Sequence, residues 1–297
     1  MNTLTQTIAI SKETVAEMPV VEYPGVITVV DTPEMARIAL RELTRARVVG
    51  FDTETRPSFH RGHIHNVALM QLSTDAHCYL FRLNILGISE PLRKFLEDPE
   101  IIKIGLSVHD DFSVMRRLVD DLDPQGFIDL QEYVKFFHIN DISLQKIYAI
   151  VFQQKISKNQ RLTNWEAQVL TEQQQRYAAI DAWACLRLYR TFRSGQFHPD
   201  ESPFVVDRSQ LCPSMNNQLI GPAEAAKHAE ALRAAEEKRR IEAERRAEGL
   251  EPEPPAKATR KRSSGRSKEA RNARRTTKIR TSKSAKTSKQ SKQSPQK

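Results

Sequence analysis

Residues 48–55 carry two acidic side chains inside a segment that otherwise favours a β-strand. The β-branched and aromatic residues of this segment favour an extended backbone. Side chains alternate between the two faces of a strand, so Asp52 and Glu54 lie on one face, about 6.6 Å apart along the strand. Two desolvated carboxylates raise each other's pKa, and a divalent cation between them is the usual compensation. The alternative is a strand that ends in a polar loop, with both acids solvated.

The first part of the chain favours strands joined by short connections, and the last three strands are typical of an antiparallel meander. These strands are expected at residues 26–30, 48–55, 67–72 and 78–81, with a helix from Pro33 to Leu43 after the first. Helices and strands then alternate, with helices expected at residues 90–96, 110–119, 143–152 and 171–192 and a strand at residues 101–105. Residues 127–130 form either a further strand or the approach to a helix ending at Phe136. The pattern predicts an α/β fold with a mixed sheet flanked by helices.

Composition divides the chain into five parts. A flexible lead-in over residues 1–22 precedes a compact domain over residues 23–198, and an irregular, Pro-containing linker follows over residues 199–222. Residues 223–250 are rich in Ala, Glu, Arg and Lys, which predicts a solvated helix. Residues 251–297 consist mainly of Lys, Arg, Ser and Thr, and they bury too little apolar surface to offset the entropy of ordering. We therefore expect a disordered basic tail.

The net charge of +9 is unevenly distributed along the sequence. Residues 223–297 contain 23 Lys and Arg against 10 Asp and Glu, a net charge of +13. Residues 1–222 contain 23 basic and 27 acidic residues, a net charge of −4. This asymmetry predicts a polyanionic partner for the tail, most often nucleic acid. A solvated tail without a partner is the alternative.

The cysteines and the hydropathy pattern bear on the cellular compartment. Cys78, Cys185 and Cys212 are far apart and match no metal-binding spacing, which fits reduced thiols inside the cell. The first 20 residues lack the pattern of a secretory signal, and no run approaches the ~18 apolar residues of a membrane helix. We expect a cytoplasmic protein without membrane contact, and the tail is compatible with association with the nucleoid or with ribosomes.

Two further acidic positions could complete a site with Asp52. Asp110 and Asp111 fall at the start of an expected helix, where the helix dipole explains one acid more easily than two. Tyr177 and Asp181 are four residues apart and therefore share one face of the last helix. Asp181 stands in an apolar run, where an acid usually has a partner. That partner is either Arg176 or Arg187 in a salt bridge, or a metal ion shared with Asp52.

A polar segment before the last helix has the composition of a nucleic-acid contact. Lys158, Arg161 and Asn164 offer cationic and amide groups beside Trp165, a combination that suits phosphates, sugars and bases. The alternative is an ordinary polar loop with Trp165 in the core. A histidine group at residues 60–65 lacks the further ligands of a zinc site, so a basic loop near the acids is favoured.

In combination, these segments resemble the 3′–5′ exonucleases of the DEDD superfamily, in the subgroup with tyrosine in the third motif. Asp52 and Glu54 match the Asp-x-Glu motif, and Asp111, six residues after a Gly that ends a strand, matches the second motif. Tyr177 and Asp181 match the Tyr-x-x-x-Asp motif. The sister subgroup has His at the position of Arg176. The resemblance covers residues 25–195 and is greatest to the exonuclease domain of Werner-type proteins and to ribonuclease D.

The resemblance implies a ribonuclease H-like fold and two-metal hydrolysis of phosphodiester bonds at the 3′ end of DNA or RNA, with release of nucleoside monophosphates. It implies two Mg²⁺ or Mn²⁺ ions, the first held by Asp52, Glu54 and Asp181. Asp52 would bridge to the second ion, which Asp111 would also hold. Tyr177 would orient the attacking water, because an unperturbed tyrosine pKa near ~10 makes a poor base at neutral pH.

The resemblance does not extend to a helicase or to the small helical domain that follows the catalytic domain of ribonuclease D, so the substrate of ribonuclease D is not transferred. Three rival functions remain. The chain could be a non-catalytic nucleic-acid-binding protein with an exonuclease-like body and a basic tail. It could be a chromatin-like or ribosome-associated factor that acts through the tail, or a proofreading module that serves a separate polymerase.

Overall fold

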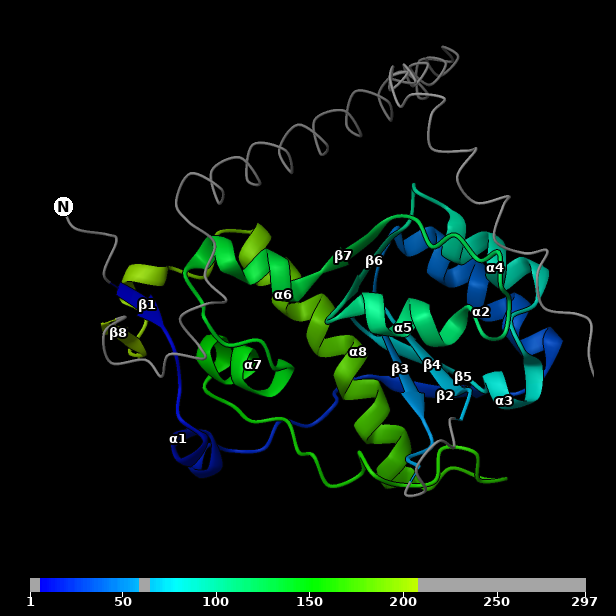
Figure 1. Cartoon of the computed structure of the whole chain (residues 1–297), viewed down its shortest axis with the longest axis horizontal. Coiled ribbons are helices and arrows are strands. Elements are labelled where there is room, and N and C mark those ends of the chain that lie inside the picture. The colour runs from blue at the N-terminus through cyan, green and yellow to red at the C-terminus, as the bar shows by residue number, and fades with distance from the viewer. Residues whose placement is uncertain (1–5, 59–64, 208–297) are drawn as a thin grey trace, which may run out of the picture. The chain divides into compact units, whose positions relative to one another are not determined.

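A six-stranded mixed sheet forms the centre of the computed structural model, which describes residues 6–58 and 65–207 (Figure 1). The strand order is β2-β5-β4-β3-β6-β7. The strands are β2 (Val26–Val30), β3 (Val48–Thr55), β4 (Val67–Ser73), β5 (His77–Phe81), β6 (Ile102–Gly105) and β7 (Phe127–Asp129). The expected α/β fold with a mixed sheet flanked by helices is confirmed.

The strand with the two acids lies inside this sheet. β3 pairs antiparallel with β4, and β4 pairs antiparallel with β5, so the predicted meander is confirmed. On its other side β3 pairs in parallel with β6. The β3–β4 register places Asp52 opposite Gln71 and Glu54 opposite Leu69.

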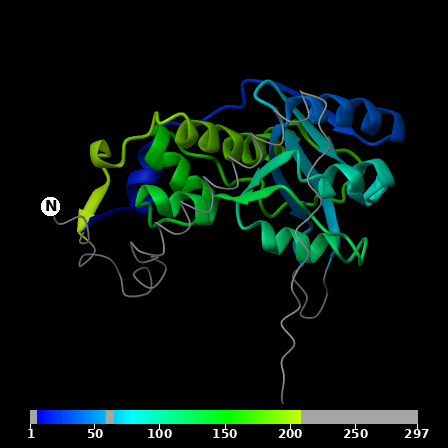
Figure 2. The same ribbon diagram turned by 90° about the horizontal axis from the view of Figure 1, so that it is seen from above.

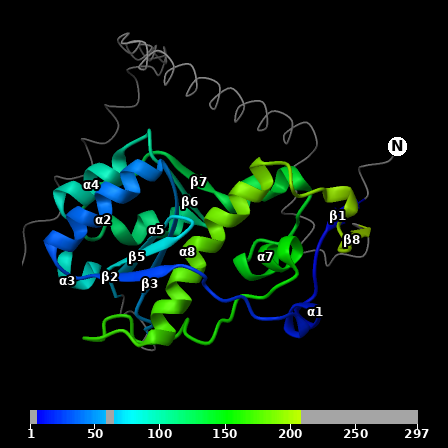
Figure 3. The same cartoon turned by 180° about the vertical axis from the view of Figure 1, so that it is seen from behind.

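Helices cover both faces of the sheet and create two apolar cores. One core contains side chains from α2 (Pro33–Ala46), α4 (Glu90–Glu97) and α5 (Val108–Met115). The other contains side chains from α7 (Leu144–Phe152) and α8 (Glu172–Arg193). Figure 3 shows α8 running across the sheet, and among the strands α8 makes its most extensive contacts with β3.

The predicted helix starts agree with the structure where a side chain caps the helix. Thr32, Ser143 and Thr171 each accept a hydrogen bond from a backbone N–H in the first turn of α2, α7 and α8. Thr171 and Gln174 form a reciprocal capping box. The region around residue 130 contains both predicted alternatives in succession. β7 leads directly into α6 (Leu130–Tyr133) and a 3-10 helix (Val134–Phe137).

The helix expected over residues 110–119 begins and ends earlier than predicted. α5 starts at Val108, after Ser107 in the left-handed region with φ of 60°. The Asp129 carboxylate accepts hydrogen bonds from the N–H groups of Ser107 and Val108, at 2.9 and 3.1 Å. This carboxylate lies about 20 residues further along the chain, which is why the local sequence does not reveal the start of α5.

The expected flexible lead-in is wrong for its described part, residues 6–22. β1 (Gln6–Ile8) pairs with β8 (Val205–Asp207), and Figure 2 shows these two strands beside each other at one end of the described chain. α1 (Lys12–Glu17) follows, and Ile8, Ile10 and Val15 are buried in the core of α7 and α8. The packed body therefore begins before residue 23 and continues past residue 198. The rest of the expected linker, the expected helix at residues 223–250 and the tail at residues 251–297 lie outside the described residues.

Among the described residues, no helix combines the length and the apolar character needed to cross a membrane.

Candidate metal centre

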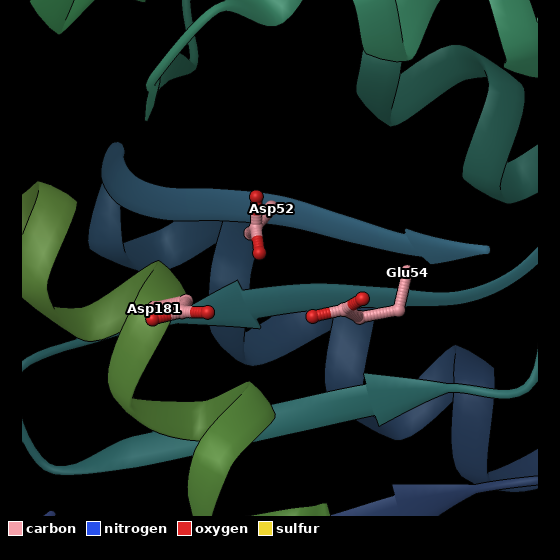
Figure 4. Close-up of side chains that lie close together, drawn as sticks. All are labelled: Asp52, Glu54 and Asp181. Atoms are coloured by element: carbon pink, nitrogen blue, oxygen red, sulfur yellow. The ribbon is translucent and has the colours of Figure 1, made fainter. Parts of the chain in front are cut away.

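Three carboxylates converge where α8 crosses β3. Asp52 and Glu54 extend from the strand, and Asp181 extends toward them from the helix (Figure 4). One oxygen from each side chain lies within 4.8 Å of the other two. Glu54 and Asp181 are buried, with 9 % and 8 % of their surface exposed, and Asp52 is partly buried. The two co-facial pairs expected from the sequence therefore meet at one place.

Gly50 allows the helix to approach the strand this closely. A Cβ atom at residue 50 would lie 1.9 Å from the carbonyl oxygen of Ala182, the residue after Asp181. Any other residue at position 50 would push α8 away from β3. The glycine two residues before Asp52 thus sets the distance between the acids of the strand and the acid of the helix.

The acids are strongly perturbed by this arrangement. Burial is the largest cause that raises the pKa of Asp52, followed by the charges of Asp181, Glu54 and Asp111. Burial and the charge of Asp181 raise the pKa of Glu54 to about 9, and burial raises the pKa of Asp181 to about 7. Ionisation of all three acids in this setting is therefore costly, and a bound cation would offset that cost.

Asp111 is not one of the three acids whose oxygens lie within 4.8 Å of one another, but its charge raises the pKa of Asp52 and of Glu54. Its carboxylate accepts a hydrogen bond from Thr53, whose side chain points to the opposite face of β3 from Asp52 and Glu54. Burial raises the pKa of Asp111 to about 7, although the bond from Thr53 acts in the opposite direction. Asp110 is exposed and is bonded to Ser107 through its side chain instead. Of the two adjacent acids, Asp111 is the one directed toward β3.

Tyr177 lies one turn before Asp181 on α8 and is 9 % exposed. Its hydroxyl is hydrogen-bonded to the Asp181 carboxylate, and burial is the largest cause that raises the pKa of Tyr177. The phenol is thus a neutral donor at physiological pH. Its ring packs against Trp165, with ring centroids 6.0 Å apart.

The salt bridge considered for Asp181 is absent from the described residues. Arg176 pairs with Glu172 at 2.6 Å, and Arg187 bonds to the hydroxyl of Tyr148 and stacks on the ring of Phe152. Neither guanidinium therefore compensates the Asp181 charge, as the alternative interpretation required.

The basic segment before α8 lies beside the acids. The charge of Lys158 lowers the pKa of Asp181, and the charge of Arg161 lowers the pKa of Glu54, while both cations are exposed to solvent. Asn164 is exposed, and its side-chain oxygen accepts a hydrogen bond from the N–H of Glu166.

Trp165 differs from the expectation of a nucleic-acid contact. Its ring has no exposed surface and packs in the core beside Tyr177, so it offers no face on which a base could stack. The polar-loop alternative, with Trp165 in the core, describes its position. Residues 59–64 of the histidine-containing loop lie outside the described residues, and His65 contacts Glu166 at 3.1 Å.

Two polar residues near the acids were not predicted from the sequence. Asp129 fixes the start of the helix that carries Asp111, and Gln71 lies opposite Asp52 in the sheet. The alternation along each strand was visible in the sequence. The register between the strands was not, and only the register brings Gln71 beside Asp52.

The donor set fits a hard divalent cation. Carboxylate oxygens are the ligands that Mg²⁺ and Mn²⁺ prefer, and Mg²⁺ sites commonly combine a few carboxylates with water and substrate phosphate. Asp52, Glu54 and Asp181 provide such ligands within a suitable span. Bound cations would also favour the ionised form of the three acids, whose pKa values burial raises.

The sequence of this chain matches a family model and two curated proteins. A family model described as 3′–5′ exonuclease matches residues 27–195. The bifunctional 3′–5′ exonuclease/ATP-dependent helicase WRN of Mus musculus is 29 % identical over 204 residues, covering 65 % of this chain and 14 % of that protein. Ribonuclease D of Escherichia coli is 28 % identical over 201 residues, covering 65 % of this chain and 52 % of the relative.

A solved structure supports the fold. The EXO domain of Aedes aegypti Nibbler superimposes with a TM-score of 0.51 at 20 % identity, over 72 % of this chain and 99 % of that one. The matched region covers 14 % of the WRN protein and 52 % of ribonuclease D. Both relatives therefore extend well beyond the region that they share with this chain.

Proposed function

Because the chain belongs to the 3′–5′ exonuclease family, we propose that it is a metal-dependent hydrolase that removes nucleoside monophosphates from the 3′ end of DNA or RNA. The observation that carries this proposal is the convergence of Asp52, Glu54 and Asp181 within 4.8 Å, in a buried setting that raises their pKa values. The presence of Tyr177 bonded to Asp181 favours the tyrosine subgroup of the DEDD superfamily.

In the proposed site, Asp52, Glu54 and Asp181 would hold one Mg²⁺ or Mn²⁺ ion, and Asp52 and Asp111 would hold a second. Such ions lower the pKa of a bound water and stabilise the charge on the leaving 3′ oxygen. These carboxylates would bind and orient the ions because each provides an anionic oxygen in a partly or fully buried setting, where water screens charges less than in bulk solvent.

Tyr177 orients the attacking water in this proposal. A raised pKa keeps the phenol protonated, so it donates a hydrogen bond and does not remove a proton. Tyr177→Phe should therefore lower kcat strongly and leave metal binding intact. Unchanged turnover would remove Tyr177 from the reaction.

Lys158 and Arg161 are proposed to contact phosphates of the substrate, because both are exposed cations that act electrostatically on the acids. Arg161→Ala should raise KM more than it lowers kcat, with similar effects on all sequences, since a phosphate contact carries no base information. The basic tail at residues 251–297 is proposed to add salt-dependent affinity for the same polyanion.

A nuclease assay tests the activity directly. Oligonucleotides labelled at the 5′ end, incubated with Mg²⁺, should give a ladder of products shortened from the 3′ end. Asp52→Ala should abolish the ladder. Asp111→Asn and Asp110→Asn form a matched pair, because the two acids are adjacent and only Asp111 is directed toward β3. Loss of activity is expected for Asp111→Asn only, and near-normal activity of Asp52→Ala would refute the metal assignment.

The substrate follows from the same assay with matched single-stranded DNA, duplex DNA with recessed 3′ ends, and RNA. Failure to digest any of the three, with retained binding, would favour the rival of a non-catalytic nucleic-acid-binding protein.

A further inference from the structure

Gln71 is a fully buried polar residue beside the candidate metal centre. It lies in β4 directly opposite Asp52, and its side chain has no exposed surface. Neither the amide nitrogen nor the amide oxygen has a hydrogen-bond partner among the described residues. Most buried polar side-chain atoms in proteins have such a partner.

Its position directs Gln71 to the face of the sheet that carries the acids. Directly opposite residues of an antiparallel pair have their side chains on the same face, with Cβ atoms about 4.5–5.5 Å apart. Asp52 is therefore within reach of the glutamine side chain. The neighbours of Gln71 on this face include Leu69 and Ser73 along the strand and Leu80 across from it on β5, all fully buried. The leucines are apolar, and the Ser73 hydroxyl donates to the carbonyl of the next residue and not to Gln71.

Packing does not explain the amide group at this position. An apolar side chain of similar length would fill the same space between Leu69 and Leu80 without leaving two buried polar atoms unpaired. Unpaired buried donors and acceptors are destabilising, and replacing them by apolar atoms of the same shape is neutral or stabilising. The amide is therefore expected to gain a partner in another state of the site.

We propose that Gln71 is a positioning residue for the metal centre, and that its amide N–H donates a hydrogen bond to the Asp52 carboxylate when a divalent cation is bound. The inference rests on the proposed function, because it requires that Asp52 holds the cation. With a cation bound, the Asp52 oxygen that does not face the cation would accept this hydrogen bond, because Gln71 lies directly opposite Asp52 in the sheet.

In other metal sites, residues that hydrogen-bond to a metal ligand hold that ligand in its binding orientation, and a bond from Gln71 would orient Asp52 in the same way. Removal of such residues typically weakens metal binding about 10–100-fold. Because Asp52 is proposed to bridge both ions, a rotation of its carboxylate would affect both sites together.

The test compares Gln71→Met with the wild type and with a control, Leu69→Met. Met approximates the length of Gln and lacks the amide. The control introduces the same residue on the same face of β4, opposite Glu54, where one apolar side chain replaces another. Mn²⁺ binding is measured by isothermal titration calorimetry without nucleic acid, and thermal unfolding is measured in chelator.

We expect Gln71→Met to bind Mn²⁺ about 10–100-fold more weakly than the wild type. Its melting temperature in chelator should be unchanged or higher, whereas a merely structural role would lower it. Leu69→Met should retain the wild-type affinity.

Two results would overturn the inference alone. One is wild-type Mn²⁺ affinity in Gln71→Met. The other is weaker binding accompanied by a lower melting temperature in chelator. If the wild type itself bound no Mn²⁺, the proposed function would fail, and the inference would fail with it.

Discussion

Replacement of Asp181 by Asn is expected to stabilise the metal-free protein while it abolishes nuclease activity. Asp181 is 8 % exposed, and burial raises its pKa from the ordinary value of 3.8 to about 7. Asn keeps a side-chain oxygen that can accept the hydrogen bond from Tyr177, so the local packing is retained. The substitution removes the ionisable carboxyl group that α8 places beside Asp52 and Glu54.

The size of the effect follows from the linkage between pKa and stability. A carboxyl group whose pKa is raised by folding contributes full stability below its unfolded pKa, and that contribution is lost as the pH rises through the folded value. One pKa unit corresponds to 1.36 kcal/mol, so with a folded pKa of about 7 ionisable Asp181 costs the metal-free protein up to about 4 kcal/mol at pH 8. At pH 5 the cost is less than half of this. For a domain of this size, the difference at pH 8 corresponds to a change in Tm on the order of 10 °C.

Thermal and urea unfolding in chelator at pH 5 and pH 8 would measure this difference. Asp181→Asn should unfold at higher temperature than the wild type, with the larger gain at pH 8, and Mg²⁺ should raise the Tm of the wild type more than that of the variant. Asp121→Asn serves as the control, because Arg93 lowers the pKa of that exposed acid and its removal should give no gain at pH 8. A variant at position 181 that is less stable than the wild type at pH 8 in chelator would refute the electrostatic reasoning.

Three further predictions concern the same acids and the tail. In chelator, the unfolding free energy of the wild type, measured by urea titration, should fall from pH 5 to pH 9. The reason is that burial raises the pKa of Asp111 to about 7 and of Glu54 to about 9. Saturating Mg²⁺ should make the unfolding free energy less dependent on pH. Asp129→Ala removes the carboxylate that caps α5, so the Mg²⁺ concentration for half-maximal activity should rise several-fold; an unchanged midpoint would show that the start of α5 does not position Asp111. Deletion of residues 257–297 should flatten the slope of log affinity against log salt in a filter-binding assay, and an equal slope would reject the tail as a nucleic-acid contact.

Local signals in the sequence predicted most elements of the fold. Thr171 followed by Gln174 indicated the start of α8, and alternating strand patterns with short connections indicated the meander. The segment at residues 6–22 could not be predicted in this way. Ile8 bonds through its N–H to the carbonyl of His138, and the N–H of Ile10 bonds to Asp141, so the partners that order this segment lie about 130 residues away.

The candidate site was only partly visible in the sequence for the same reason. Strand and helix periodicity placed Asp52 with Glu54 and Tyr177 with Asp181, but neither periodicity brings the strand to the helix. At the level of the sequence, only the resemblance to a family indicated that the two pairs belong to one site. In the structure, Gly50 lets α8 approach β3 closely enough to bring the two pairs together. The burial of Trp165 depends on how the segment before α8 packs against Tyr177, which no local pattern specifies.

The cations near the acids do not restore the ordinary pKa values of the site. Lys158 and Arg161 each lower the pKa of one acid, yet the pKa of Asp181 remains at about 7 and that of Glu54 at about 9. Both cations are exposed, so water screens them and leaves them free to bind phosphates. One oxygen from each of the three acids lies within 4.8 Å of the other two, a span that one divalent ion can bridge. Ionisation of these acids in the metal-free protein therefore lowers its stability. A bound divalent ion is expected to remove this destabilisation, so that metal binding and folding stability are coupled.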